Sequence, residues 1–208
     1  MLLMVNKIKL LILTVFVAAI SVTPTVIFAE TETVTLTATV NVALALTISS
    51  ANYSFGSLIP GSPVKGSGGI DVFVETSAPN GYTLAIHDSV GGTDSALLHS
   101  DATTRIADFT STIASPSVWS SGTSKGLGLT VYSADTSKEA KWGTGTTYND
   151  ANNAYVAVPQ TASIIHSSAG YKAGIDTTSI AFILDVPPSQ KTGNYSGTTI
   201  ITATAVLE

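Results

Sequence analysis

Hydrophobic and polar residues alternate along several parts of this chain, and the longest such run lies near the N-terminus. Over residues 34–48 an apolar side chain occupies every second position, mostly with threonine between. Strict alternation predicts a half-buried β-strand. Fifteen residues at about 3.3 Å each would span about 50 Å, whereas ordinary strands are roughly 3–10 residues long. We therefore expect this segment to bend between two sheets or to extend beyond its own domain.

Shorter alternating runs predict further strands. They cover residues 70–75, 82–87, 127–131 and 180–186, with shorter apolar stretches at 155–158 and 162–166 and a closing strand within 195–207. The first two runs flank Asn80-Gly81, a pair that favours the positive backbone angles of a tight hairpin. We expect residues 70–87 to form such a hairpin.

No segment has convincing helical periodicity, and about eight to ten short strands with Gly, Pro and Asn turns are expected. This pattern predicts an all-β chain forming a single antiparallel β-sandwich, immunoglobulin-like or of a related Greek-key type. Residues 30–208 would form this domain. Residues 88–126 are polar and irregular, so we expect a loop-rich insertion there.

The first 29 residues have the order of a secretory signal peptide. Lys7 and Lys9 precede an apolar run at residues 10–20, and Ala29 offers a cleavage site. An uncleaved membrane anchor is the alternative. The leader predicts a secreted protein that is associated with the cell surface.

Composition narrows the classes of partner. The chain has no cysteine and a formal net charge of −5. Loss of Lys7 and Lys9 with the leader leaves seven basic residues against fourteen acids, a charge of −7. This balance excludes a basic nucleic-acid footprint and argues against adhesion to an acidic membrane once the leader is cleaved.

Chemical motifs are scarce, so we expect neither an enzyme nor a metal or other cofactor. The serines form no G-x-S-x-G elbow, and the acids give no reason to choose a catalytic pair. Aromatic side chains in the loop-rich middle are the better candidates for ligand contacts, namely Trp119, Trp142 and Tyr148. The alternative is that they cover the core beneath long loops.

Four short motifs resemble the WxL family of Gram-positive surface proteins. They are Phe55-Gly56, residues 81–86 (GYTLAI), residues 180–186 before Pro187, and residues 191–197 (KTGNYSG). Together they span nearly the whole mature chain. The resemblance implies a β-sandwich that binds the cell wall non-covalently.

Both signature tryptophans of that family are replaced here. Tyr82, Thr83 and Leu84 occupy the first W-x-L motif, and Ile201 and Ala203 stand at the second. Because these motifs are implicated in wall binding, the chain could share the fold without the affinity for the wall.

Two main functions follow from these observations. The first is an exported, non-catalytic adhesive or structural β-sandwich that contacts cell-wall polymer or other surface proteins. The alternative is a self-assembling fibre or pilus-like subunit, in which the N-terminal strand at residues 33–48 completes a neighbour's sheet. Its donor side chains would include Val34, Leu36, Val40 and Val42. A carbohydrate-binding module is a third possibility.

Overall fold

A computed structural model describes residues 33, 35–66, 68–89 and 97–208 of the chain. The predicted signal peptide at residues 1–29 therefore lies outside the described residues. The chain divides into two units, Met1–Thr39 and Val40–Glu208. In the first unit, residues 33 and 35–39 form neither helix nor strand.

The second unit is built from β-strands. In chain order they are β1 (Leu44–Ile48), β2 (Ile70–Thr76), β3 (Gly81–Asp88), β4 (Leu97–His99), β5 (Arg105–Ile106), β6 (Ser117–Val118), β7 (Gly126–Ala134), β8 (Ala154–Ala157), β9 (Ser163–Ala169), β10 (Asp176–Asp185), β11 (Tyr195–Ser196) and β12 (Thr199–Ala205). One turn of 3₁₀-helix, η1 (Ala140–Trp142), precedes β8. Every pairing between these strands is antiparallel. The all-β, antiparallel prediction is confirmed.

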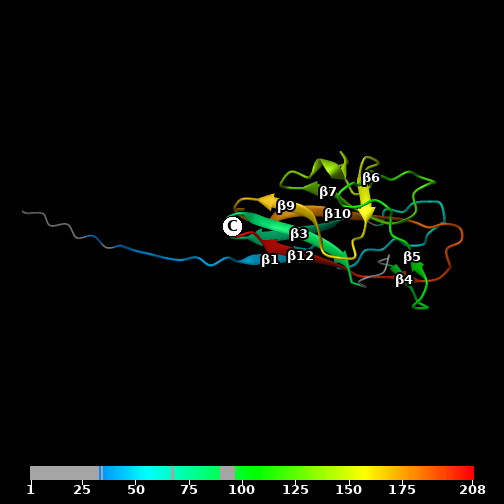
Figure 1. The fold of residues 1–208 in the computed structure, drawn as a ribbon, viewed down its shortest axis with the longest axis horizontal. Helices are drawn as coiled ribbons and strands as arrows, with labels where there is room; N and C mark the ends of the chain where they lie inside the picture. Colours follow the sequence, from blue (N-terminus) through cyan, green and yellow to red (C-terminus); the bar gives the residue numbers. More distant parts are fainter. Residues whose placement is uncertain (1–32, 34, 67, 90–96) are drawn as a thin grey trace, which may run out of the picture. The chain divides into compact units, whose positions relative to one another are not determined.

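The strands form three sheets (Figure 1). The largest has the order β1-β2-β10-β7-β8-β6, the second β12-β3-β9, and the third, a small one, β11-β4-β5. β10 lies inside the largest sheet between β2 and β7, and it ends at Asp185, before the two prolines that cannot continue the ladder.

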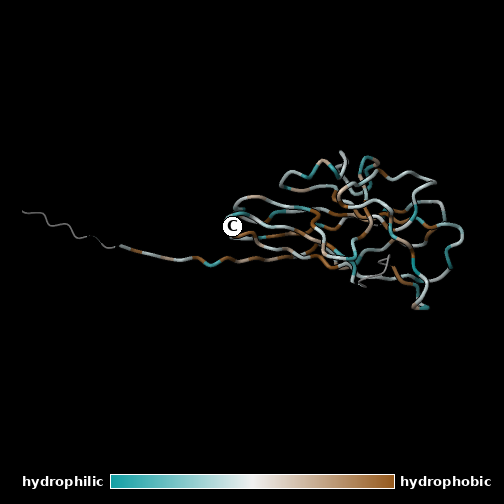
Figure 2. Tube along the Cα trace, viewed as in Figure 1, coloured by the Kyte–Doolittle hydropathy of each residue, from teal (hydrophilic) through white to brown (hydrophobic). Residues whose placement is uncertain are grey.

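One hydrophobic core joins the two larger sheets. Val72 on β2 and Ile180 on β10 belong to the same buried cluster as Leu84 on β3 and Ile165 on β9. In Figure 2 the hydrophobic positions, in brown, recur along these strands. The period-two alternation of β2 and β3 accounts for this, because it turns every second side chain inward.

The predicted hairpin at residues 70–87 was wrong, although both of its strands exist. β2 pairs with β1 and β10, whereas β3 pairs with β9 and β12. The turn at residues 77–80 therefore carries the chain from one sheet to the other. Gly81 has φ +82°, and a Cβ there would collide with the carbonyl of Ser168 on β9. Glycine at this position therefore allows the backbone of β9 to pack close to that of β3.

The strand predicted over residues 34–48 is also shorter than expected. Only Leu44–Ile48 pairs with a neighbour, β2. Residues 40–43 form no strand, and the side chains of Val40 and Val42 are 86% and 45% exposed. An alternating pattern shows only that a segment could form a strand. In the described part of the chain, this segment has a neighbouring strand only from residue 44 onward.

The remaining predicted strands are observed with altered limits. The closing strand is divided into β11 and β12 at Gly197 and Thr198. Within residues 88–126, the described part contains the short strands β4, β5 and β6, joined by turns and extended chain. Of residues 105–110, only the two of β5 belong to a strand.

Candidate functional site

Two sheet edges meet along a seam, which we define as the boundary between β1 and β12. Each of these strands pairs on one side only, β1 with β2 and β12 with β3, and the two contact each other (Figure 1). Among the described residues, the other side of each strand therefore carries backbone amide and carbonyl groups without a ladder partner. Such free edges are templates for an additional strand.

The core-facing residues of β1 remain partly open to solvent. Leu46 is paired with Val74 and Ile48 with Val72, and both β2 residues are buried in the core. Directly paired residues project from the same face of a sheet. Yet Ile48 is 41% exposed and Leu44, on the same face, is 39% exposed. The core is thus uncovered along this edge.

The matching residues of β12 complete the seam from the second sheet. Ile201 pairs with the buried Ile86, and Ala203 pairs with the buried Leu84. Both β12 side chains pack against the core and are only half-buried. Close to Ile201 and Ile48 the seam opens into a hollow of about 190 Å³.

Neither edge carries the devices that usually keep β-edges apart. Residues 33–48 contain no charged residue, proline or glycine, and residues 194–207 contain no charge or proline. Native proteins commonly place lysine, proline or an inward-pointing charge on free edge strands to prevent pairing between chains. Neither charge nor proline on these two edges therefore opposes the addition of another strand at the seam.

The donor residues proposed from sequence fall partly in each unit. Val34 lies outside the described residues, and Leu36 belongs to the first unit, where its side chain is exposed. Val40 and Val42, in the second unit, are exposed as described above.

A second feature is a cleft of about 580 Å³ between residues 53–60 and residues 190–197. The ring of Tyr53 stands edge-on to Phe55, with centroids 5.2 Å apart. The Tyr53 hydroxyl donates to the carbonyl of Lys65 at 2.6 Å, and burial raises its pKa to about 12. Tyr195, which also lines the cleft, packs its ring 4.9 Å from that of His99.

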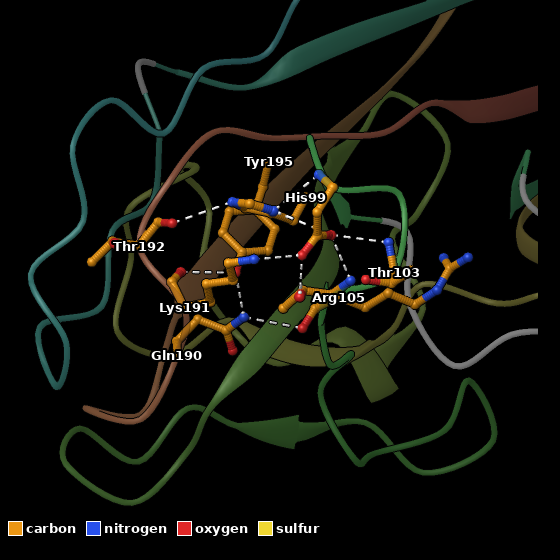
Figure 3. Close-up of polar contacts among 9 residues, drawn as sticks. His99, Thr103, Arg105, Gln190, Lys191, Thr192 and Tyr195 are labelled. Carbon is orange, nitrogen blue, oxygen red and sulfur yellow. Dashed lines mark hydrogen bonds and ion pairs between the residues drawn. The ribbon is translucent and has the colours of Figure 1, made fainter.

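Polar contacts hold the 190–197 segment against β4 and β5 (Figure 3). Gln190 donates through Nε2 to the carbonyl of Arg105 at 3.1 Å and to the Tyr195 hydroxyl at 2.7 Å. Lys191 donates to Asp101 at 2.8 Å. That hydrogen bond, followed by those from Thr103 and Thr104, holds the pKa of the Asp101 carboxyl well below its usual range. These hydrogen bonds therefore fix the position of the 190–197 segment, which forms one wall of the cleft.

His99 on β4 contacts the 190–197 segment as well. Its Nδ1 accepts the backbone amide of Asp101 at 3.1 Å. Nε2 must then carry the hydrogen, and it donates to the carbonyl of Thr192 at 3.2 Å. The rings of Tyr53, Phe55 and Tyr195 line this cleft, and aromatic faces of this kind are common in ligand pockets.

The three aromatic residues proposed as ligand contacts lie in different settings. Trp142 is 0% exposed and donates its Nε1 hydrogen to the carbonyl of Ile165 at 3.1 Å. It is a core residue, so its prediction as an accessible ligand contact was wrong. Trp119 is half-buried against Phe109 and Tyr155, and Tyr148 is half-buried in the loop before β8.

The positions assigned to the W-x-L motifs lie on paired strands. Tyr82 and Leu84 on β3 are buried and Thr83 is half-buried, while Ile201 and Ala203 lie opposite on β12. In this chain both motif positions thus line the core beside the seam. The resemblance to the WxL family stays a prediction.

Sequence reasoning missed a buried polar cluster between the two larger sheets. Asp176 accepts hydrogen bonds from Ser168 at 2.6 Å and Thr136 at 2.8 Å. His166 is nearby and 1% exposed, and burial lowers the pKa of its imidazole. Because Asp176 and Ser168 are also buried, this cluster holds the sheets rather than facing a ligand.

Comparisons with known proteins add no relative. No protein-family model matches the chain, and no match was found among curated proteins or among solved structures.

Within the described residues, no helix is long and apolar enough to span a membrane. In the same part of the chain, no group of three or more His, Cys, Asp or Glu side chains is placed to hold a metal ion.

Proposed function

We propose that the protein is an exported, non-catalytic β-sandwich subunit that assembles with further copies of itself at the cell surface. The observation that carries this proposal is the seam, where two uncharged β-edges lie together above a partly uncovered core. Of the two main functions predicted from the sequence, this observation favours the assembling subunit.

The seam favours assembly for two physical reasons. A strand added there would satisfy backbone hydrogen-bonding groups that lack a ladder partner, and it would remove half-exposed apolar side chains such as Leu44 and Ile48 from water. Burial of apolar surface is the main driving force of protein association. Both gains come from the same act of binding.

The predicted export agrees with such a role. A leader at residues 1–29 would deliver the chain to the cell surface. Because the chain has no cysteine, its fold does not depend on disulfide formation there. Hydroxyl-rich strand faces, with 51 Ser and Thr residues after position 30, suit an exposed structural protein.

Light scattering coupled to size-exclusion chromatography tests this proposal on the mature chain, residues 30–208. We expect the average mass to rise with protein concentration. Ala203→Lys should suppress that rise, because its inward-pointing charge enters the seam, while Thr202→Lys on the solvent face of β12 should not. A chain that stays monomeric at every concentration would contradict the proposal.

The cleft between residues 53–60 and 190–197 favours a second candidate function, the binding of a cell-wall glycan. Titration calorimetry with soluble peptidoglycan fragments tests it. Tyr195→Ala would remove an aromatic face and the partner of Gln190 and should abolish binding, whereas Tyr171→Ala, in an exposed loop after β9, should leave it unchanged. Absence of heat with the unaltered chain would exclude this candidate.

A further inference from the structure

The chain itself carries a segment with the chemistry that the seam requires. We propose that residues 35–42 of a second copy add to the seam as a β-strand, so that copies join head to tail. This inference rests on the proposed function, because it names the partner and the segment through which assembly takes place.

The pattern of the segment matches an inserted strand. Leu36, Ala38, Val40 and Val42 occupy alternate positions, with threonine or asparagine between them. In an extended strand these four side chains project from one face. Placed in the seam, that face would cover the half-exposed Ile201 of β12, and the polar residues would face solvent.

Length and space also agree. Residues 36–42 form a stretch of seven, the same number as Thr199–Ala205 of β12. The hollow of about 190 Å³ beside Ile48 and Ile201 offers room for an aliphatic side chain of the added strand. The donor stretch therefore matches β12 in length, and the hollow could take one of its aliphatic side chains.

Chain geometry favours a second copy over the segment's own domain. The segment runs directly into β1, so it could return along the seam of its own domain only through a tight turn at residues 40–43. These residues are Val-Asn-Val-Ala. Tight hairpins need positive φ angles, which Asn-Gly, Asp-Gly or Gly-Gly pairs supply and valine and alanine resist.

Electrostatics place no barrier against this pairing. The donor segment, β1 and β12 contain no charged residue, so neither repulsion nor the desolvation of charge opposes insertion. Donor and acceptor are also different surfaces of the same chain. An interface of this heterologous kind continues from copy to copy and produces open chains rather than closed dimers.

Charge placed on either face of the donor segment provides the first test. In the mature chain, Leu36→Lys with Val40→Lys puts charge on the apolar face, and Thr35→Lys with Thr39→Lys puts the same charge on the other face. We expect the first variant to remain monomeric in light scattering and the second to assemble like the unaltered chain. Assembly of the first variant at the unaltered level would overturn the inference while leaving self-assembly intact.

Cysteine cross-linking locates the donor segment on the neighbouring copy. Its result cannot be produced merely by a variant that fails to fold. Because the chain has no cysteine, single cysteines at Thr35, Thr37 or Thr39 can be mixed with a size-tagged copy carrying Thr202→Cys or Thr47→Cys. A disulfide needs Cα atoms within about 7 Å. We expect mixed dimers for at least one donor position.

The matched control is a tagged copy with Thr144→Cys, an exposed loop position. Mixed dimers with Thr144→Cys as abundant as those with the seam variants would overturn the inference. If the unaltered mature chain forms no assemblies at all, the proposed function itself fails, and this outcome is separate from the loss of donor specificity.

Discussion

Trp142 illustrates how one side chain anchors a long loop. It lies in η1, is fully buried, and its indole hydrogen bonds to the carbonyl of Ile165 on β9. The ring thereby attaches the loop before β8 to the β12-β3-β9 sheet. Its neighbours in the sequence are polar, which explains why a sequence pattern alone suggested an exposed ring.

Replacement of Trp142 should therefore destabilise the fold strongly. We expect Trp142→Ala to lower the free energy of unfolding by about 3–5 kcal/mol, the usual cost of deleting a large buried aromatic side chain. Urea unfolding followed by circular dichroism measures this loss. Trp119→Ala, at a half-buried position, should cost clearly less, and equal losses would contradict the assignment of Trp142 to the core.

His166 should make the stability of the fold depend on pH. Burial lowers the pKa of its imidazole below the ordinary 6.5. The unfolded chain then binds the proton more readily than the folded chain, so stability is complete above about pH 6.5 and falls as the pH decreases from there.

Urea midpoints at pH 7.5 and pH 5.5 test this prediction. We expect a lower midpoint at the acid pH for the unaltered chain and a smaller difference for His166→Gln. The Asp176 carboxyl, whose pKa is also lowered, loses its stabilising contribution only below its ordinary value of about 3.9. An unchanged pH dependence in His166→Gln would exclude the histidine as its source.

At the scale of elements, the connection from β2 to β3 depends on one glycine. Gly81 and Gly122 have nearly the same φ, +82° and +83°, but a Cβ on Gly81 would strike the carbonyl of Ser168, and one on Gly122 would meet open space. The two positions separate the cost of backbone strain from the cost of a clash.

We expect Gly122→Ala to cost about 1 kcal/mol, because it only places alanine in the left-handed region. Gly81→Ala carries the same strain and must also push β9 away from β3. Its loss of stability should therefore be distinctly larger. Thermal unfolding of both variants measures the difference, and similar losses would show that the chain passes between the sheets without this close approach.

Sequence patterns predicted the strands better than their partners. The alternation at residues 70–75 and 82–87 correctly predicted β2 and β3, since it reports which face of a strand is buried. It did not reveal that the two strands belong to different sheets, because pairing depends on contacts with β9, β10 and β12, which are distant in sequence.

The candidate site was predictable in part. The uncharged alternating run at residues 34–48 is enough by itself to suggest a donor strand. The acceptor was not predictable, since the lack of charge over residues 194–207 acquires meaning only when β12 is found at a sheet edge beside β1. The contacts of Lys191 with Asp101 likewise join residues far apart in the chain.

At the scale of the whole molecule, assembly should respond weakly to salt. The seam and the donor segment carry no charge, so screening has little to act on, even though ionic strength strongly affects interactions between exposed charges. We expect the mass measured by light scattering to change little between low and high sodium chloride concentrations. A marked loss of mass at high salt would indicate an interface built on ion pairs instead.

The position of the donor segment directly before β1 has a mechanical consequence. Tension along a chain of joined subunits would pass from the donor segment through Ala43 into β1, whose five residues pair side by side with β2. Force along the strand axis would load that ladder in shear, with its pairs resisting together. The cleft at residues 53–60 and 190–197 lies outside this direct load path, so a subunit could bear tension while its loops keep their shape.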